Sequence, residues 1–200
     1  ILMNQAVMQR PPSREVYFCL LRPHFLDDGL EKIQAAYEFS KYGHYKQKRD
    51  SGVRYFDHPK AVSLIVFQEW RVFNWRCMVG ALLHDIREDS FILSEKRIRI
   101  NFGKKSAYDV KLLTKEDAEY FSRLLKSGNW RAMLIKIADR IHNLRTLECR
   151  PREKQKEQVE ETRAHFFDLC DALEEVIPRK YRHVIPMARS ELRTLCKKYD

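Results

Sequence analysis

The sequence lacks three features that define common classes of protein. No stretch approaches the roughly 18 uninterrupted apolar residues that a membrane-spanning helix needs, so we do not expect a membrane protein. The first five residues do not form a basic leader before a long apolar segment, so we expect no signal peptide. The five cysteines are odd in number and contain no CxxC pair, which argues against a disulfide framework and a cysteine-ligated zinc. We expect reduced, mostly buried thiols and a cytoplasmic location.

Glycine is also scarce, with 6 in 200 residues, and the periodic apolar patterns are helical. We therefore predict an all-α fold, and the 44% hydrophobic content suits one domain with a proper core. Helices are predicted over residues 13–21, 30–42, 59–70, 74–88, 94–103, 104–113, 117–126, 130–147 and 153–176, before a last helical piece punctuated by Pro178 and Pro186. We expect a short leader (1–12), a main domain (13–177) and a C-terminal helical extension (178–200) packed on that domain.

The formal charge of +10 is compatible with several anionic partners, and net charge alone does not choose between them. Lysine and arginine alternate with acidic residues along most of the chain, as on solvated helix faces. The tightest basic group is Lys46, Lys48 and Arg49, in a predicted loop over residues 43–57. No nucleic-acid motif accompanies it, so we do not expect a nucleic-acid partner.

A cluster of acidic residues and one histidine ends the predicted helix 74–88. On a helix, His84 and Glu88 are four residues apart, as are Asp85 and Asp89, so each pair shares a face. Carboxylates gathered at the end of an apolar helix repel one another unless a cation neutralises them, and imidazole and carboxylate are standard ligands for Mn, Fe or Zn. The ordinary interpretation is a solvated helix end with a capped His-Asp pair.

Two further fragments favour the metal interpretation. Asp139, Asn143 and Thr146 form one polar stripe on the otherwise apolar helix 130–147, where a buried aspartate needs a cation or several donors. A neighbouring arginine is the alternative partner for Asp139. His58 precedes Pro59, which we expect to be the first residue of its helix, with His58 at the cap in extended geometry. Alone, His58 would be read as a cap or core histidine.

Together, these fragments resemble the HD superfamily, whose metal sites use an H…HD…D pattern, and more closely the hydrolase domain of the RelA/SpoT homologues and the small alarmone hydrolases. The resemblance covers roughly Gln34 to Leu173. It rests on the ordered fragments Ala35–Phe39, His44, Gln47–Gly52, Tyr55, His58–Pro59, Ala81–Asp85, Glu88–Asp89, Phe102–Gly103, Leu113–Lys115, Leu134–Leu147, Pro151–Gln155, Glu161–Thr162 and Phe166. It implies an HD-domain helical bundle.

The resemblance implies one Mn²⁺ per chain, with Fe, Co or Zn as alternatives, held by four ligands: His58, His84, Asp85 and Asp139. It implies removal of the 3′-pyrophosphate of (p)ppGpp-type alarmones to give GDP or GTP, with Glu88 and Asp89 orienting or deprotonating the attacking water. Arg49 matches the arginine that packs on the purine, and Ser51 belongs to the same loop. Arg140 is a candidate phosphate contact, and Asn143 and Thr146 match positions that face the nucleoside. Lys46 and Lys48 are added as phosphate contacts on charge alone.

Three positions depart from the family pattern. Asp50 stands where the family usually has a lysine, and Lys46 stands where it usually has a glycine. Arg87 stands where the family has an apolar or small residue. These changes leave the metal ligands intact but leave the base preference open. The alternatives are (p)ppApp, NADPH phosphatase activity, a dNTP or another nucleotide, or a non-catalytic nucleotide-binding module. Because the chain ends at Asp200, without room for a synthetase domain, we expect it to degrade alarmone without making it. A homo-oligomer is left open.

Overall fold

The computed structural model describes residues 11–86, 94–115 and 117–200. Its helices are α1 (Arg14–Leu21), α2 (Asp27–Gly43), α3 (Asp57–Leu64), α4 (Trp75–Leu83), α6 (Glu95–Leu113), α7 (Tyr120–Lys126), α8 (Trp130–Arg145), α9 (Arg152–Val176) and α10 (Val184–Lys198). Short helical turns lie at η1 (Arg22–His24), η2 (Ile65–Glu69, a π-helix that continues α3), η3 (Leu147–Cys149) and η4 (Arg179–Tyr181). In these described ranges the β pairing is one isolated bridge, between Lys48 and Arg54. The all-α prediction is confirmed.

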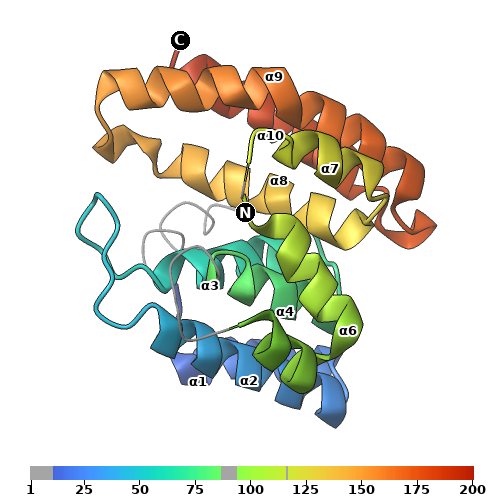
Figure 1. The fold of residues 1–200 in the computed structure, drawn as a ribbon. Helices are drawn as coiled ribbons and strands as arrows, with labels where there is room; N and C mark the ends of the chain where they lie inside the picture. The colour runs from blue at the N-terminus through green and yellow to red at the C-terminus, as the bar shows by residue number, and fades with distance from the viewer. Residues whose placement is uncertain (1–10, 87–93, 116) are drawn as a thin grey trace.

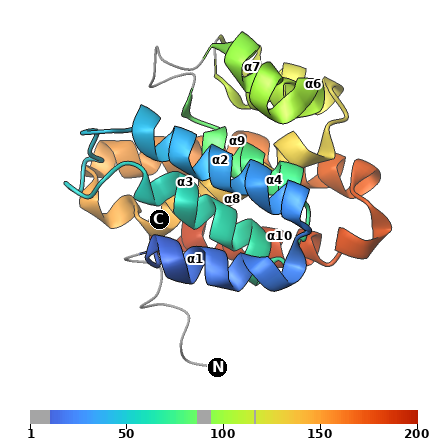
Figure 2. The same cartoon turned by 90° about the horizontal axis from the view of Figure 1, so that it is seen from below.

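Helix α8 lies at the centre of the molecule. It packs against α3 and α4 on one side and against α9 and α10 on the other (Figure 1). Seen from below, α3 lies between α1 and α2 (Figure 2), where the Tyr17 hydroxyl of α1 bonds Ser63 of α3 at 2.8 Å. The apolar face of each helix is buried in one continuous core, and no helix in the described part of the chain has the length and hydropathy to cross a bilayer.

The approach of α4 to α8 depends on a glycine. A Cβ built on Gly80 would lie 2.6 Å from Cδ1 of Ile135, closer than real Cβ contacts allow. Any larger residue would push the two helices apart or displace Ile135. Gly80 thus lies where α4, which ends just before His84, packs on α8, which carries Asp139.

Local signals placed several helix ends correctly. Ser13 accepts the Val16 amide and caps α1, and Ser94 caps α6 in the same way through Arg97. The predicted break at Gly103 is present as a kink inside α6, where φ is 82°, a backbone conformation that glycine adopts without cost. The Asn74 side chain accepts two amides at the start of α4.

Three local predictions were wrong. The helix predicted over residues 30–42 begins earlier, at Asp27, so Asp27 and Asp28 lie in the first turn of α2, where carboxylates stabilise the amino end of the dipole. His58 is not an extended cap: α3 begins at Asp57, and Pro59 is tolerated there because first-turn amides have no intrahelical acceptor. Helix α4 ends at Leu83 rather than continuing to Glu88, and the i, i+4 pairs with Glu88 and Asp89 lie partly outside the described residues.

Candidate metal centre

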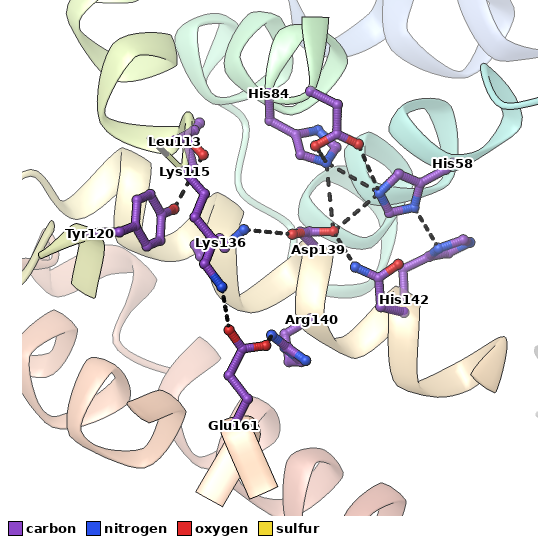
Figure 3. Close-up of polar contacts among 12 residues, drawn as sticks. His58, His84, Leu113, Lys115, Tyr120, Lys136, Asp139, Arg140, His142 and Glu161 are labelled. Atoms are coloured by element: carbon purple, nitrogen blue, oxygen red, sulfur yellow. Dashed lines mark hydrogen bonds and ion pairs between the residues drawn. The ribbon is translucent and has the colours of Figure 1, made fainter. Parts of the chain in front are cut away.

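Three segments that are distant in sequence bring four side chains to one point. His58 comes from the first turn of α3, His84 and Asp85 directly follow α4, and Asp139 lies in the middle of α8. His58, His84 and Asp139 are buried, with exposed fractions of 3%, 1% and 5%. Figure 3 shows their polar atoms pointing toward one another. The two ring nitrogens and the Asp139 carboxylate lie close enough to bind a single metal ion.

The distances in this group match the edges of a coordination polyhedron. The Nε2 atoms of His58 and His84 are 3.2 Å apart, and Oδ1 of Asp139 lies 3.1 Å and 3.6 Å from them. Asp85 completes the group, with Oδ2 3.4 Å from His58 and Oδ1 3.1 Å from His84. Ligands about 2.1 Å from a central ion are about 3.0 Å apart in an octahedron and about 3.4 Å apart in a tetrahedron. His58, His84 and Asp139 therefore lie close enough together to hold one metal ion, and Asp85 contacts both histidines.

The outer hydrogen bonds prepare this arrangement. Nδ1 of His84 lies 2.8 Å from the carbonyl oxygen of Ala81. A carbonyl only accepts, so that nitrogen carries the ring proton and Nε2 is left with a lone pair toward the centre. The Tyr55 hydroxyl donates to Oδ2 of Asp85 at 2.9 Å and fixes that carboxylate.

Asp139 is held from two sides. Its Oδ2 accepts from Lys136 Nζ at 3.1 Å, one turn earlier on α8, and its Oδ1 accepts from the Asn143 amide at 2.7 Å, one turn later. The side-chain oxygen of Asn143, Oδ1, in turn accepts a hydrogen bond from the Arg49 guanidinium at 2.6 Å. The cationic partner of Asp139 on its own helix is thus Lys136, not the neighbouring arginine weighed from the sequence.

The electrostatics of the cluster favour a positive charge at its centre. Burial alone would lower the pKa of His84, but the charges and hydrogen bonds of Asp85 and Asp139 outweigh it and raise the pKa to about 10. Burial would raise the pKa of both carboxyls. His84 and His58 instead hold the pKa of Asp85 well below its usual range, and Lys136 with the same histidines does so for Asp139. A proton on imidazole occupies the role that a divalent cation would take.

A cavity of about 290 Å³ opens beside these ligands. Six cationic side chains line it: Lys48, Arg49, Lys115, Lys136, Arg140 and Arg150. Some of this charge is compensated locally, since Glu161 pairs with both Lys115 and Arg140 (Figure 3), and Asp50 pairs with Arg150 at 2.9 Å. Burial would raise the pKa of Glu161, but Arg140 and Lys115 outweigh it and lower the pKa to about 2. The cavity can therefore hold a polyanion next to the metal ligands.

The other predicted site residues divide into two groups. Lys48, Arg49, Arg140 and Asn143 line the cavity, although the Arg140 guanidinium is bound by Glu161 and Gln158. Lys46, Ser51 and Thr146 are exposed and do not line it. The Thr146 hydroxyl donates to the His142 carbonyl oxygen at 3.0 Å. Glu88, Asp89 and Arg87 lie outside the described residues, so the catalytic roles given to Glu88 and Asp89 stay predictions.

The sequence analysis assigned no role to three residues that touch the predicted ligands: Tyr55, Lys136 and His142. Lys136 was detectable, because it lies three residues before Asp139 and so shares its helix face.

The backbone of Lys46 explains one departure from the family pattern. Its φ of 69° is left-handed, a conformation that favours glycine, which is the residue that the resemblance expects at that position.

Comparisons with known proteins agree with this geometry. No family model matches the chain. The guanosine-3′,5′-bis(diphosphate) 3′-pyrophosphohydrolase of Aquifex aeolicus is 34% identical over 153 residues, which cover 72% of this chain and 22% of that protein. The bifunctional (p)ppGpp synthase/hydrolase SpoT of Escherichia coli is 27% identical over 209 residues, which cover 90% of this chain and 29% of that protein. The chain thus spans less than a third of the length of these relatives.

A solved structure supports the fold. It is a metazoan orthologue of SpoT, described as hydrolysing ppGpp, and it superposes with a TM-score of 0.66 at 22% identity over 84% of this chain and 94% of that one.

Proposed function

We propose a function from one premise: this chain belongs with the HD-type hydrolase domains of the RelA/SpoT homologues. The function is metal-dependent removal of the 3′-pyrophosphate of (p)ppGpp-type alarmones, giving GDP or GTP and pyrophosphate. The observation that carries it is the convergence of His58, His84, Asp85 and Asp139 beside a cationic cavity.

The donor set fits a divalent cation. Two imidazole nitrogens and two carboxylates are hard-to-borderline ligands suited to Mn²⁺, Fe²⁺ or Zn²⁺, and we propose Mn²⁺. His58, His84, Asp85 and Asp139 would hold it. A cation there would supply Lewis-acid chemistry, which activates water and neutralises phosphate charge.

The protein's own residues bind and orient the substrate. In the reaction, a water oxygen bonds to the phosphorus attached to the ribose 3′ oxygen, the bond from phosphorus to that oxygen breaks, and the 3′ oxygen takes up a proton. Lys136 lines the cavity in contact with Asp139, so its ammonium group lies where it can attract the attacked phosphate. Glu88 and Asp89 remain the predicted acceptors of the water proton.

Arg49 is the predicted contact for the base, and Asp50 lies next to it with Arg150. The lysine that the resemblance expects at position 50 is replaced by an aspartate, whose charge Arg150 compensates. The support for an alarmone with two diphosphates therefore comes from the other cations that line the cavity, among them Lys48, Arg49 and Lys136.

Product analysis tests the proposal. The purified protein is incubated with ppGpp, ppApp and NADPH side by side, with Mn²⁺ and with a chelator. We expect GDP and pyrophosphate from ppGpp, only when metal is present. Turnover of ppApp or NADPH without turnover of ppGpp would show that the substrate is not ppGpp. No turnover of any of the three at saturating metal would contradict the enzymatic assignment.

One broader expectation belongs to the same proposal. The cytoplasm is the predicted compartment, and cell fractionation tests it.

A further inference from the structure

His142 makes a contact that neither the sequence nor the proposed function explains. It lies on α8, three residues after Asp139, and its side chain is buried, with an exposed fraction of 5%. Its Nδ1 lies 2.8 Å from Nδ1 of His58, on the side of that ring away from the metal centre (Figure 3). The same Nδ1 lies 3.5 Å from Nη1 of Arg49.

These contacts favour one placement of the ring protons. A guanidinium group has only donors, so the His142 nitrogen that faces Arg49 is favoured as a lone pair. With a lone pair on that atom, the bond to His58 forms only if Nδ1 of His58 carries the proton. The neutral His58 ring then has its lone pair on Nε2, the atom that faces Asp85, Asp139 and His84.

We propose that His142 is a positioning residue, which accepts the Nδ1 proton of His58 and so holds His58 in the tautomer that can bind a metal ion. Arg49 keeps His142 in the accepting state, which links the loop that carries Arg49 to the metal centre. His84 makes the equivalent hydrogen bond to the Ala81 carbonyl oxygen. Each of the two predicted ligand imidazoles is thus oriented by an acceptor at its Nδ1. The inference rests on the metal centre of the proposed function.

A purely structural role makes a different prediction. If His142 only filled space in the core, leucine of similar size would replace it. If it acts as an acceptor, asparagine should replace it better, because the asparagine Oδ1 occupies nearly the same position along the side chain as the histidine Nδ1 and also accepts a hydrogen bond.

The test is the affinity of metal-free protein for Mn²⁺, measured by isothermal titration calorimetry. We expect His142→Leu to bind Mn²⁺ about 10- to 100-fold more weakly than the wild type, the usual effect of losing an outer partner of a ligand. His142→Asn should stay within about threefold. His24→Leu, at an exposed histidine of η1, is the matched control and should bind as the wild type does. Equal affinity of His142→Leu and wild type, or equal weakening of the leucine and asparagine variants, would overturn the inference.

Two measurements separate this inference from its premise and from misfolding. Asp139→Asn removes a ligand; if it too leaves Mn²⁺ affinity unchanged, the metal centre of the proposed function fails. Nitrogen-15 NMR of the Zn²⁺-loaded wild type reads the tautomers directly and needs no variant. We expect the His142 proton on Nε2 and the His58 proton on Nδ1, and a His142 proton on Nδ1 would overturn the inference.

Discussion

The Nε2 atoms of His58 and His84 face each other at 3.2 Å, and both also face the carboxylates of Asp85 and Asp139. Two neutral imidazoles do not gain from such an approach when both present lone pairs. The arrangement is stable when a positive charge lies between them, either a proton on one ring or a metal ion shared by both. Binding a metal ion would therefore compete with protonation of the site.

The first prediction concerns the ligand set. Asp139→Asn keeps the shape of the side chain but removes the charge that faces both histidines, so Mn²⁺ affinity should fall by about 100-fold or more, the upper end of metal-site losses. Hydrolysis of ppGpp should become undetectable. Calorimetry and product analysis on the same preparation measure both effects. Asp168→Asn, at an exposed aspartate of α9, is the control and should retain both properties. A ligand variant with wild-type metal affinity would refute the site.

The second prediction concerns the pH dependence of stability without metal. The pKa of His84 is raised in the folded protein to about 10, because Asp85 and Asp139 outweigh the effect of burial. Its ordinary value is near 6.5, so His84 contributes stability that is fully present below pH 6.5 and is lost as pH rises toward 10. Urea unfolding in chelator at several pH values should show the free energy of unfolding falling across this window.

Two controls isolate the contribution of His84. His84→Gln should remove most of the decline between pH 6.5 and 10, since glutamine does not titrate. Saturating Mn²⁺ should also suppress it in the wild type, because the ion stabilises the folded state and requires the unprotonated ring. A wild-type curve that is flat over this window in chelator would contradict the electrostatics of the cluster.

Sequence reasoning succeeded where the signal was local or carried by a motif. The helix start at Ser13 and the break at Gly103 follow from single residues whose chemistry does not depend on the fold. The four predicted ligands were identified from the H…HD…D pattern of the resemblance. The structure brings these four side chains together, and their role as metal ligands stays a prediction.

The errors have a common physical cause. His58 was expected in extended geometry because of Pro59, but the first turn of α3 accommodates the proline and burial holds the histidine. The roles of Lys136 and His142 depend on which side chains the neighbouring segments place opposite them. Nothing local to His142 indicates that it faces His58, 84 residues away in the chain.

The third prediction concerns the packing of α6 on α8. Asp109 is fully buried and accepts from Arg131 and Asn129, at distances of 2.6 to 3.0 Å. Asp109→Ala leaves the half-buried Arg131 without its partner, so the free energy of unfolding should fall by about 3 kcal/mol. Urea unfolding measures it. Asp117→Ala, which breaks an exposed pair with Arg123, is the matched control and should change little. Equal changes in the free energy of unfolding for both variants would show that the buried ion pair contributes no more to stability than the exposed one.

The fourth prediction separates substrate binding from metal binding. Lys136 lines the cavity and touches Asp139 through Oδ2, and its pKa is raised because Asp139 outweighs the effect of burial, so it is charged. Lys136→Met removes a charge that attracts phosphate but leaves all four ligands in place. We expect kcat/KM for ppGpp to fall about 10- to 100-fold at saturating Mn²⁺, the range of one charge-assisted contact. Mn²⁺ affinity should not fall, since losing a neighbouring cation does not disfavour a second one.

Lys104→Met, at an exposed lysine of α6, is the control for this variant and should leave kcat/KM unchanged. The ratio of the two effects decides the role of Lys136. If Lys136→Met loses Mn²⁺ affinity in step with turnover, the lysine acts by holding Asp139 in its ligating orientation. If turnover falls while metal affinity is kept, the ammonium group acts on the phosphate, because the metal centre is then intact and only the attraction for the anionic substrate has changed.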